Sequence, residues 1–401
     1  MKIVHLVDYF MPQMGYQEFY LAREHKRFGH KVWVVTSDRY YPFVDFDNTA
    51  GSILGKRIVG VGQRQERGIS VIRLPILFEH QPSALVFIKN LGKTLKIISP
   101  DVVFCDGLFS LNAILVAWHQ KNLGYRLVYD NHASDYNTKL TDNPIKKFYI
   151  NFLFKPLFAP LIKGRATAIV SAVGEAEQDF VAEHFVIPKN KIPIIPLGVE
   201  IYPKEKIKKW RREMRKVFNF SEDDVAIVTA GKIDRRKRIE DLIYALKRLE
   251  GEEVRLFVFG SGERRYINQL KRLAKNLGVQ KKIEFQGAYK EENEAKLLSG
   301  FDIGVWAGVH SQAVRKSLAA GLPLILPERV SKTQTSKFLL SYDNGLSFKK
   351  GNVQSLSSAI RKLAHSKPLR KEMGENSRRL AKDKLSWQKI AKGYLKIVGS
   401  L

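Results

Sequence analysis

Short apolar runs alternate with helical patterns along the first half of the chain. Residues 2–7 form an apolar run, and a helical pattern follows over 17–28, ended by Gly29. The β-branched run at 31–36 has no polar side, as in parallel strands that are buried on both faces. Further apolar runs, separated by helical spacers, lie at 102–105, 126–129 and 168–171. Strands that alternate with helices predict a parallel, doubly wound sheet.

The same alternation begins again after a proline-rich, extended segment near residues 192–203 and a highly charged stretch at 204–216. The expected helices of this second series are 239–249 and 266–277, with two more near the C-terminus. Its expected strands are 225–230, 254–259, 283–285, 303–306, 322–326 and 346–348. We therefore predict an α/β protein with two similar Rossmann-like domains in tandem.

The predicted domains are residues 1–197 and 198–385, and the closing helix over about 386–401 can pack back on the first domain. Ligands of open α/β sheets bind beyond the carboxyl ends of the strands. We expect two such sheets to face each other there across a central cleft. The loops that follow strands are therefore the expected place for the chemistry.

The composition fits this organisation. A chain of 401 residues with 44% hydrophobic residues can fill two cores. No apolar stretch approaches the roughly 18–20 residues of a membrane span, and the apolar start is interrupted by Asp8. The single cysteine, Cys105, excludes an intrachain disulfide and is typical of a reducing compartment. We expect a cytoplasmic protein.

The net charge of +28 is unevenly distributed. Residues 1–200 hold 24 Lys and Arg against 18 Asp and Glu, whereas residues 201–401 hold 44 against 22. Such a basic surplus attracts nucleotides, anionic lipids or nucleic acid without choosing among them. No nucleic-acid recognition module is present, so we expect no specific nucleic-acid partner.

Several segments, taken in order, resemble the retaining glycosyltransferases of family 4, which have the GT-B fold. The resemblance spans nearly the whole chain. It rests on PQMGYQE at 12–18 with GHKV at 29–32, IPLGVE at 195–200, GKIDRRK at 231–237, FGSGE at 259–263, AAGLP at 319–323 and SW at 386–387. The resemblance implies transfer of a sugar, with retention, from a nucleotide sugar to a glycan, glycolipid or protein-linked oligosaccharide.

Sugar transfer requires that the diphosphate leaving group be neutralised. Asp45-Phe46-Asp47 spells the Asp-x-Asp motif of metal-dependent transferases, but no strand precedes it, and we expect no metal or other cofactor. Fixed cations are the alternative. Lys232 and Lys237 lie between a strand and a helix N-terminus, which also attracts anions. The resemblance implies that both lysines contact the diphosphate, although a solvated basic loop would have the same composition.

Glycines after strands allow the backbone to approach a ligand closely. Gly15 follows the first strand, and the resemblance implies contact with donor or acceptor, although a tight turn would use the same residue. The second glycine usual in the family is replaced by Tyr16. Gly260 and Gly262 follow the strand at 254–259 and are donor-binding candidates, or turn glycines with a supporting role.

His132 follows the apolar run at 126–129. The resemblance places it at the histidine that reaches the transferred sugar, where it would hydrogen-bond a hydroxyl and position the anomeric carbon. Asp135 is a neighbouring candidate for the donor site. A histidine at a strand end can also be an ordinary, satisfied polar group.

The donor helix departs from the family pattern. Two glutamates, eight positions apart, normally bind the sugar and the ribose there, and the matching positions hold Gly308 and Lys316. The loop from Trp306 to Ser311 resembles a family variant, and the resulting donor-site candidates are His310, Ser311, Gln312 and Lys316. An ammonium offers three donors and no acceptor. Lys316 therefore indicates either an anionic donor group or a site that has lost its donor.

Two further alternatives stay open. Residues 146–158 combine lysines with aromatic and aliphatic residues, a pattern typical of contact with an anionic membrane surface and also of a helix that faces a core. We expect peripheral contact at the inner membrane surface on the first interpretation. The altered donor helix equally allows a catalytically impaired protein that binds a sugar nucleotide or a partner without turnover.

Overall fold

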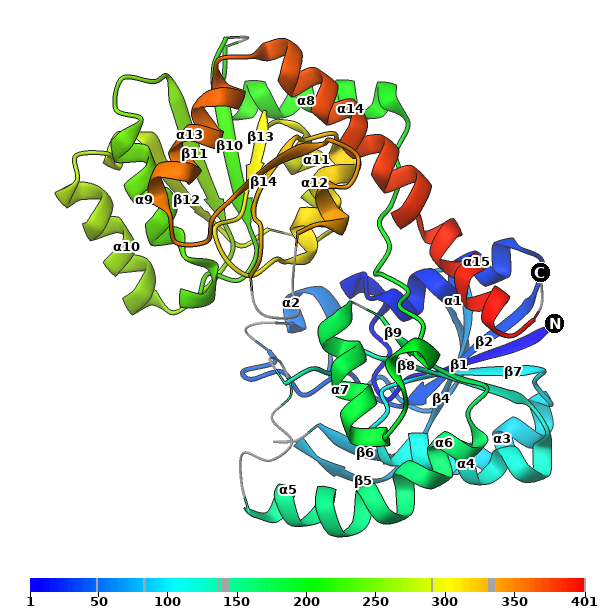
Figure 1. The fold of residues 1–401 in the computed structure, drawn as a ribbon. Helices are drawn as coiled ribbons and strands as arrows, with labels where there is room; N and C mark the ends of the chain where they lie inside the picture. The colour runs from blue at the N-terminus through cyan, green and yellow to red at the C-terminus, as the bar shows by residue number, and fades with distance from the viewer. Residues whose placement is uncertain are drawn as a thin grey trace. The chain divides into compact units, whose positions relative to one another are not determined.

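The computed structural model describes residues 1–47, 50–81, 84–135, 138, 144–172, 174–221, 223–289, 291–330 and 336–399. The chain divides into two compact units (Figure 1). The N-terminal unit comprises Met1–Leu197 together with Trp387–Leu401, and the C-terminal unit comprises Gly198–Ser386. Each unit is built on one mainly or wholly parallel sheet with a hydrophobic cluster on either face, which confirms the predicted α/β class.

The sheet of the N-terminal unit has the strand order β3-β4-β2-β1-β7-β8-β9. Only β3 runs antiparallel to its neighbour, at the edge of the sheet. The strands are β1 (Lys2–Leu6), β2 (Lys31–Ser37), β3 (Gly62–Glu66), β4 (Ile69–Leu74), β7 (Val102–Asp106), β8 (Arg126–Asn131) and β9 (Ala168–Ser171). A separate antiparallel pair is formed by β5 (Ile76–His80) and β6 (Leu85–Ile88). Strands β3 to β6 were not predicted from the sequence; of these, β3 is polar and β5 is largely exposed.

Two helices cover one face of this sheet, α1 (Gln17–Arg27) and the C-terminal α15 (Trp387–Ile397). The other face carries α3 (Leu91–Ile98), α4 (Leu111–Leu123), the π-helix η3 (Tyr149–Phe158), α6 (Ala159–Arg165) and α7 (Glu175–Phe185). Shorter elements are η1 (Pro12–Met14), α2 (Gly51–Leu54), α5 (Pro144–Phe148) and η4 (Lys189–Lys191).

The last helix belongs to the N-terminal unit because its apolar residues recur at helical spacing and are buried there. Trp387, Ile390, Ala391, Tyr394 and Leu395 form this stripe. The ring of Trp387 stacks on Tyr20 of α1 at 4.6 Å. This packing brings Tyr394 close to the ends of β7 and β8, where it lines a pocket.

All six strands of the C-terminal unit are parallel, in the order β12-β11-β10-β13-β14-β15. They are β10 (Val225–Ala230), β11 (Val254–Phe259), β12 (Ile283–Gly287), β13 (Ile303–Val305), β14 (Leu324–Pro327) and β15 (Gly345–Phe348). The longer helices are α8 (Lys204–Val217), α9 (Ile239–Arg248), α10 (Arg264–Asn276), α11 (Glu291–Ser299), α12 (Gln312–Ala320), α13 (Val353–Ala364) and α14 (Lys367–Leu380). The shorter ones are η5 (Arg235–Lys237), η6 (Gln280–Lys282), η7 (Phe338–Leu340) and the π-helix η8 (Ala381–Leu385).

Among the described residues, no helix has the length and apolar character needed to cross a bilayer.

Candidate functional site

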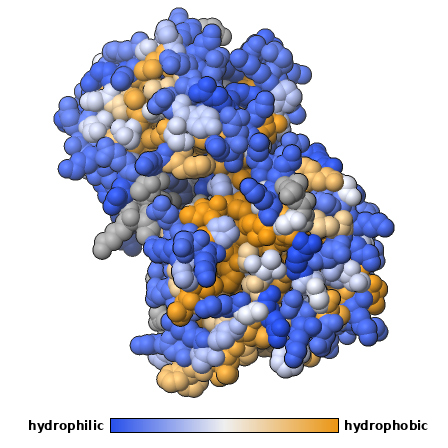
Figure 2. All heavy atoms as spheres, turned by 45° about the vertical axis from the view of Figure 1, so that its right-hand side comes forward, coloured by the Kyte–Doolittle hydropathy of each residue, from blue (hydrophilic) through white to orange (hydrophobic). Residues whose placement is uncertain are grey.

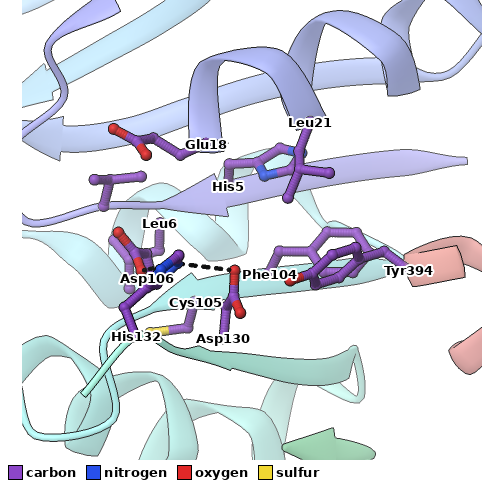
Figure 3. Close-up of a pocket in the computed structure, with 11 residues that line it drawn as sticks. His5, Leu6, Glu18, Leu21, Phe104, Cys105, Asp106, Asp130, His132 and Tyr394 are labelled. Carbon is purple, nitrogen blue, oxygen red and sulfur yellow. Dashed lines mark ion pairs between the residues drawn. The ribbon is translucent and has the colours of Figure 1, made fainter. Parts of the chain in front are cut away.

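A pocket opens in the N-terminal unit at the carboxyl ends of its central strands (Figure 3). It encloses about 310 Å³, including the part open to solvent. Residues of β1, α1, β7, β8 and α15 line it, and its polar side chains are His5, Glu18, Asp106, Asp130, His132 and Tyr394. Three of these six polar side chains, Glu18, Asp106 and Asp130, are carboxylic acids.

His132 lies between two of these carboxylates. Its Nε2 is 3.4 Å from Oδ2 of Asp130 and 3.7 Å from Oδ1 of Asp106. Figure 3 shows the imidazole lying between these two side chains, with Glu18 above them on α1. About a third of the His132 side chain stays exposed, so a ligand can reach it.

The register of the sheet explains this arrangement. Residues Asp106 and Asp130 are paired neighbours at the ends of the adjacent parallel strands β7 and β8. His132 follows β8 directly. Gln17 of α1 donates its amide N–H groups to the Asp130 carboxylate and, at 2.9 Å, to the Tyr394 hydroxyl. The buried side of the cluster is thus fixed by α1 and α15.

The cluster holds His132 as a cation. Desolvation lowers the pKa of His132, but the Asp130 carboxylate, assisted by Asp106 and Glu18, outweighs it and raises the pKa to about 10. Burial raises the pKa of the Glu18 carboxyl, and the nearby Asp106 adds to this. Burial likewise raises the pKa of Asp106, although His132 opposes the shift. At neutral pH His132 is therefore a hydrogen-bond donor and not a general base.

One group of side chains in the described part of the chain is compact enough to hold a metal ion. The ligand atoms of Asp106, Asp130 and His132 lie within 4.8 Å of one another. The Asp-x-Asp motif is not part of this group. Its residues Asp45 and Asp47 are exposed in the turn before α2.

The other two candidates of this unit lie in loops. Gly15 ends η1 with a φ of 66°, a left-handed conformation that suits glycine, and the chain then enters α1. Asp135 is exposed beyond β8. The ion-pair partners of His132 are thus the strand-end carboxylates Asp106 and Asp130, and not the neighbouring candidate Asp135.

A second set of candidates meets at the carboxyl edge of the C-terminal unit, where backbone packs directly on backbone. A Cβ at position 260 would lie 1.9 Å from the carbonyl oxygen of Gly231, and φ is +137° at Gly260 and +126° at Gly231. A Cβ at position 262 would lie 2.1 Å from the carbonyl oxygen of Ile233. Only glycine fits positions 260 and 262, so these residues bring the loops after β10 and β11 together.

The loop after β13 packs on the same place. The amide of Val309 donates to the Arg236 carbonyl at 3.0 Å, and the Lys237 ammonium donates to the Val309 carbonyl at 2.8 Å. A Cβ at Gly308 would lie 2.0 Å from the Arg236 carbonyl oxygen. This contact gives a physical reason for the departure at Gly308, since no glutamate fits there without moving the backbone.

The two candidate lysines differ in environment. Lys232 is exposed, whereas Lys237 is half-buried immediately before α9. Burial lowers the pKa of Lys237 to about 8, with Asp234 opposing and Arg236 assisting the shift. A neighbouring anion would favour the charged form of Lys237.

The start of α12 holds three further candidates. The Ser311 hydroxyl donates to the carbonyl of Ala230 at 2.8 Å and thereby joins this loop to the end of β10. His310 contacts the Ser336 hydroxyl at 3.1 Å through Nε2. Burial, together with the nearby Arg315 and Lys237, lowers the pKa of His310 to about 3, so its ring is neutral. Gln312 is exposed.

Lys316 forms an ion pair within the unit. Its ammonium lies 2.5 Å from Oε2 of Glu294 on α11, and the Tyr289 hydroxyl donates to Oε1 of the same carboxylate at 2.7 Å. Glu294 is almost fully buried. The charge of Lys316 is therefore balanced by Glu294, a partner that was not predicted from the sequence.

Several residues of these sites were not predicted from the sequence. Glu18, Asp106, Asp130 and Tyr394 surround His132, and Glu294 faces Lys316. A signal existed for Asp106 and Asp130, because each carboxylate lies at the end of an apolar strand. No local signal indicates Tyr394, which comes from the last helix.

Two family models match the chain. The model described as Glycosyltransferase Family 4 matches residues 19–201, and the model described as Glycosyl transferases group 1 matches residues 211–380.

The chain is also similar in sequence to curated proteins. An uncharacterized glycosyltransferase of Methanocaldococcus jannaschii is 26% identical over 279 residues, which cover 68% of this chain and 67% of that protein. The alpha-monoglucosyldiacylglycerol synthase of Streptococcus pneumoniae is 24% identical over 241 residues, covering 56% of this chain and 51% of the synthase.

The fold is also found among solved structures. The Anabaena protein HepE, crystallised in complex with UDP, superposes over the full length of both chains with a TM-score of 0.68 and 15% identity. At that identity the likeness concerns the fold, and it confirms the predicted fold class.

Proposed function

Because this chain belongs to the GT-B glycosyltransferases of group 1, we propose that it transfers a sugar from a nucleoside diphosphate sugar, with retention of configuration and without a metal ion. The proposed acceptor is a hydroxyl of a glycan, a glycolipid or a protein-linked oligosaccharide. The bond between the anomeric carbon and the diphosphate oxygen breaks as the acceptor oxygen bonds to that carbon. The acceptor proton leaves with the diphosphate.

One observation carries this proposal: the glycine-lined junction of loops at the carboxyl edge of the C-terminal unit. Gly231, Gly260 and Gly308 leave only backbone between three strand ends, and Lys237 lies beside them. A diphosphate is bound well by backbone that it can approach closely, by a cation and by a helix N-terminus, here that of α9. The exposed Lys232 extends the same positive region.

The proposed role of His132 follows from its charge state. Held as a cation by Asp106 and Asp130, it donates a hydrogen bond to a hydroxyl of the transferred sugar and helps to orient the anomeric carbon. Retention is consistent with this role. An inverting reaction needs a base that takes the proton of the acceptor, and a cationic His132 cannot be that base. The remaining donor contacts that we propose come from Gly15, Asp135, Gly262, His310, Ser311 and Gln312.

A thermal-shift screen tests the donor site. UDP, GDP and ADP sugars are compared in the presence of EDTA, with UDP-glucose first because HepE was crystallised with UDP. One donor class should raise the unfolding temperature of the wild type but not of Lys237→Gln. Lys247→Gln, an exposed lysine of α9, is the matched control. A shift that requires Mg²⁺ or Mn²⁺ would contradict metal independence.

A second candidate function is a transferase relative that binds a sugar nucleotide without turnover. It is favoured by Lys316, whose ammonium is bound to Glu294 where the family resemblance expects a ribose-binding carboxylate. The ion pair also weighs against an anionic donor group at this position, because Glu294 already balances the lysine. Donor turnover separates the two candidates, since a binding protein would be stabilised by the donor and would leave it intact.

A further inference from the structure

Five neighbouring helices of the N-terminal unit contain no acidic residue. The helices α3, α4, α5, η3 and α6 lack Asp and Glu throughout, yet every one of them carries lysine. These elements pack in series, α3 on α4, α4 on α6, α6 on η3 and η3 on α5 (Figure 1). We call their outer surface the basic helical face. Its described cations are Lys93, Lys96, Lys121, Lys147, Lys155, Lys163 and Arg165.

This one-sided distribution is hidden in the charge of the whole region. Residues 1–200 hold 24 basic and 18 acidic side chains, a nearly balanced set. The acidic ones lie on other elements, such as α7, which packs beside α6 and holds Glu175, Glu177, Asp179 and Glu183. The basic helical face therefore presents positive charge that is not diluted by carboxylates of its own.

Large apolar side chains project from the same helices. Phe152 is 65% exposed and Leu157 is 58% exposed on η3, and Phe148 stacks on Phe152 with ring centres 4.9 Å apart. Trp118 of α4 and Ile97 of α3 are also exposed. The inner side of η3 is anchored in the core by Ile150 and Phe154. Figure 2 shows apolar residues along the lower edge of the N-terminal unit, the level at which Figure 1 draws α5 and α6.

We propose that the basic helical face docks this protein on an anionic lipid bilayer. Lysines attract the anionic head groups, while the aromatic and aliphatic tips enter the boundary between head groups and acyl chains. Lipid fits better than nucleic acid, because aliphatic residues such as Ile97, Leu153 and Leu157 cannot stack on bases as aromatic rings do. The proposal extends the proposed function by setting the acceptor reaction at a membrane surface.

Vesicle flotation without any substrate tests docking independently of sugar transfer. The full chain is mixed with vesicles of equal parts phosphatidylcholine and phosphatidylglycerol, or of phosphatidylcholine alone. Binding is expected to the mixed vesicles only and to weaken as salt is added. Equal binding to both vesicles, or binding to neither, overturns the proposal. A protein that docks but does not transfer sugar would refute only the proposed function.

Two pairs of charge variants locate the binding surface. Lys93→Glu with Lys121→Glu alters the basic helical face, and Lys271→Glu with Lys275→Glu makes the same charge change on exposed lysines of α10. Each lysine near an anionic bilayer contributes about fivefold in affinity, so the first pair should weaken binding by about 20-fold or more. The second pair should bind as the wild type does. Equal losses would mean that total charge, and not this surface, determines binding.

An apolar pair tests insertion. Phe152→Ser with Leu157→Ser should weaken binding by roughly tenfold or more, because both side chains would lose apolar contact with the bilayer. Because both side chains are exposed, we expect the double variant to fold normally, and an unchanged unfolding temperature checks this. Val217→Ser, at an equally exposed apolar residue of α8, is the control. Unchanged binding of the double variant, or displacement of the wild type onto single-stranded RNA in the presence of vesicles, overturns the proposal.

Discussion

The ion pair between Lys316 and Glu294 gives a sharp test of how the altered donor helix is built. The two residues join α12 to α11, with 2.5 Å between Nζ and Oε2. The side chain of Glu294 is 5% exposed and that of Lys316 is 23% exposed. The variant Lys316→Met keeps the approximate length of the side chain and removes its charge. The buried Glu294 carboxylate then keeps the hydrogen bond donated by the Tyr289 hydroxyl but loses its ion pair.

The expected cost follows from this burial. Removing one partner of a buried ion pair destabilises a protein by about 3–5 kcal/mol, and the partial exposure of Lys316 reduces this to about 2–4 kcal/mol. A unit of this size loses about 2–4 °C in unfolding temperature per kcal/mol. Lys316→Met should therefore lower the unfolding temperature of the C-terminal unit by roughly 4–16 °C.

Reversing the charge separates structure from donor binding. Lys316→Glu places two carboxylates together and should destabilise the unit more than Lys316→Met. The exchanged double variant, Lys316→Glu with Glu294→Lys, restores the pair and should recover most of the loss. It also puts a carboxylate on α12, where the family resemblance expects one. Stronger stabilisation by ordinary hexose donors in the double variant would indicate that the native site had lost a donor contact.

The assay is thermal unfolding followed by fluorescence, with unfolding in urea as a second measure. Lys247→Met is the matched control, because Lys247 pairs with Glu250 on the surface and should contribute less than about 1 kcal/mol. The reasoning is refuted if Lys316→Met and Lys247→Met unfold at the same temperature, or if the exchanged double variant is no more stable than Lys316→Glu.

Three further predictions concern other parts of the molecule. Gly260→Ala should destabilise the C-terminal unit by more than about 3 kcal/mol, because its Cβ would meet a carbonyl oxygen at 1.9 Å, whereas Gly251→Ala has open space and should leave the unfolding temperature nearly unchanged. The affinity for UDP, measured by calorimetry, should fall as pH rises through about 8, where Lys237 loses its proton. The variant Lys237→Gln should bind UDP at least tenfold less tightly than the wild type and without this dependence on pH. Burial lowers the pKa of His25 from 6.5 to about 3, so below pH 6.5 the unfolded chain binds a proton that the folded chain does not. The free energy of unfolding should therefore fall as pH drops from 6.5 toward 3, by up to about 4–5 kcal/mol. In urea titrations His25→Gln should flatten this dependence on pH, and an unchanged slope would contradict the prediction.

The fold was largely predictable because parallel strands buried on both faces leave continuous apolar runs. The runs at 225–230 and 254–259 coincide with β10 and β11. The polar edge strand β3 has no such pattern and was missed. Edge strands are held by one neighbour only, so their sequences are less constrained by burial.

The candidate site was predictable only in part, because its contacts join residues far apart in sequence. Lys237 could be found from its place between strand and helix. Its contact with Val309 could not, since the two residues are 72 positions apart. Tyr394 reaches the His132 pocket only because α15 returns to the N-terminal unit. Glu294 meets Lys316 across two helices whose packing no local pattern describes.

The proposed function requires that this chain break the bond between a sugar and a nucleoside diphosphate with retention of configuration. The most direct measurement follows a panel of UDP, GDP and ADP sugars by NMR, with EDTA present and no acceptor. We predict slow hydrolysis of one donor class, release of the sugar first in the anomeric configuration of the donor, and a rate at least tenfold lower for His132→Ala. Initial release of the opposite anomer would contradict retention. Complete stability of every donor, including any that raises the unfolding temperature, would contradict the enzyme itself.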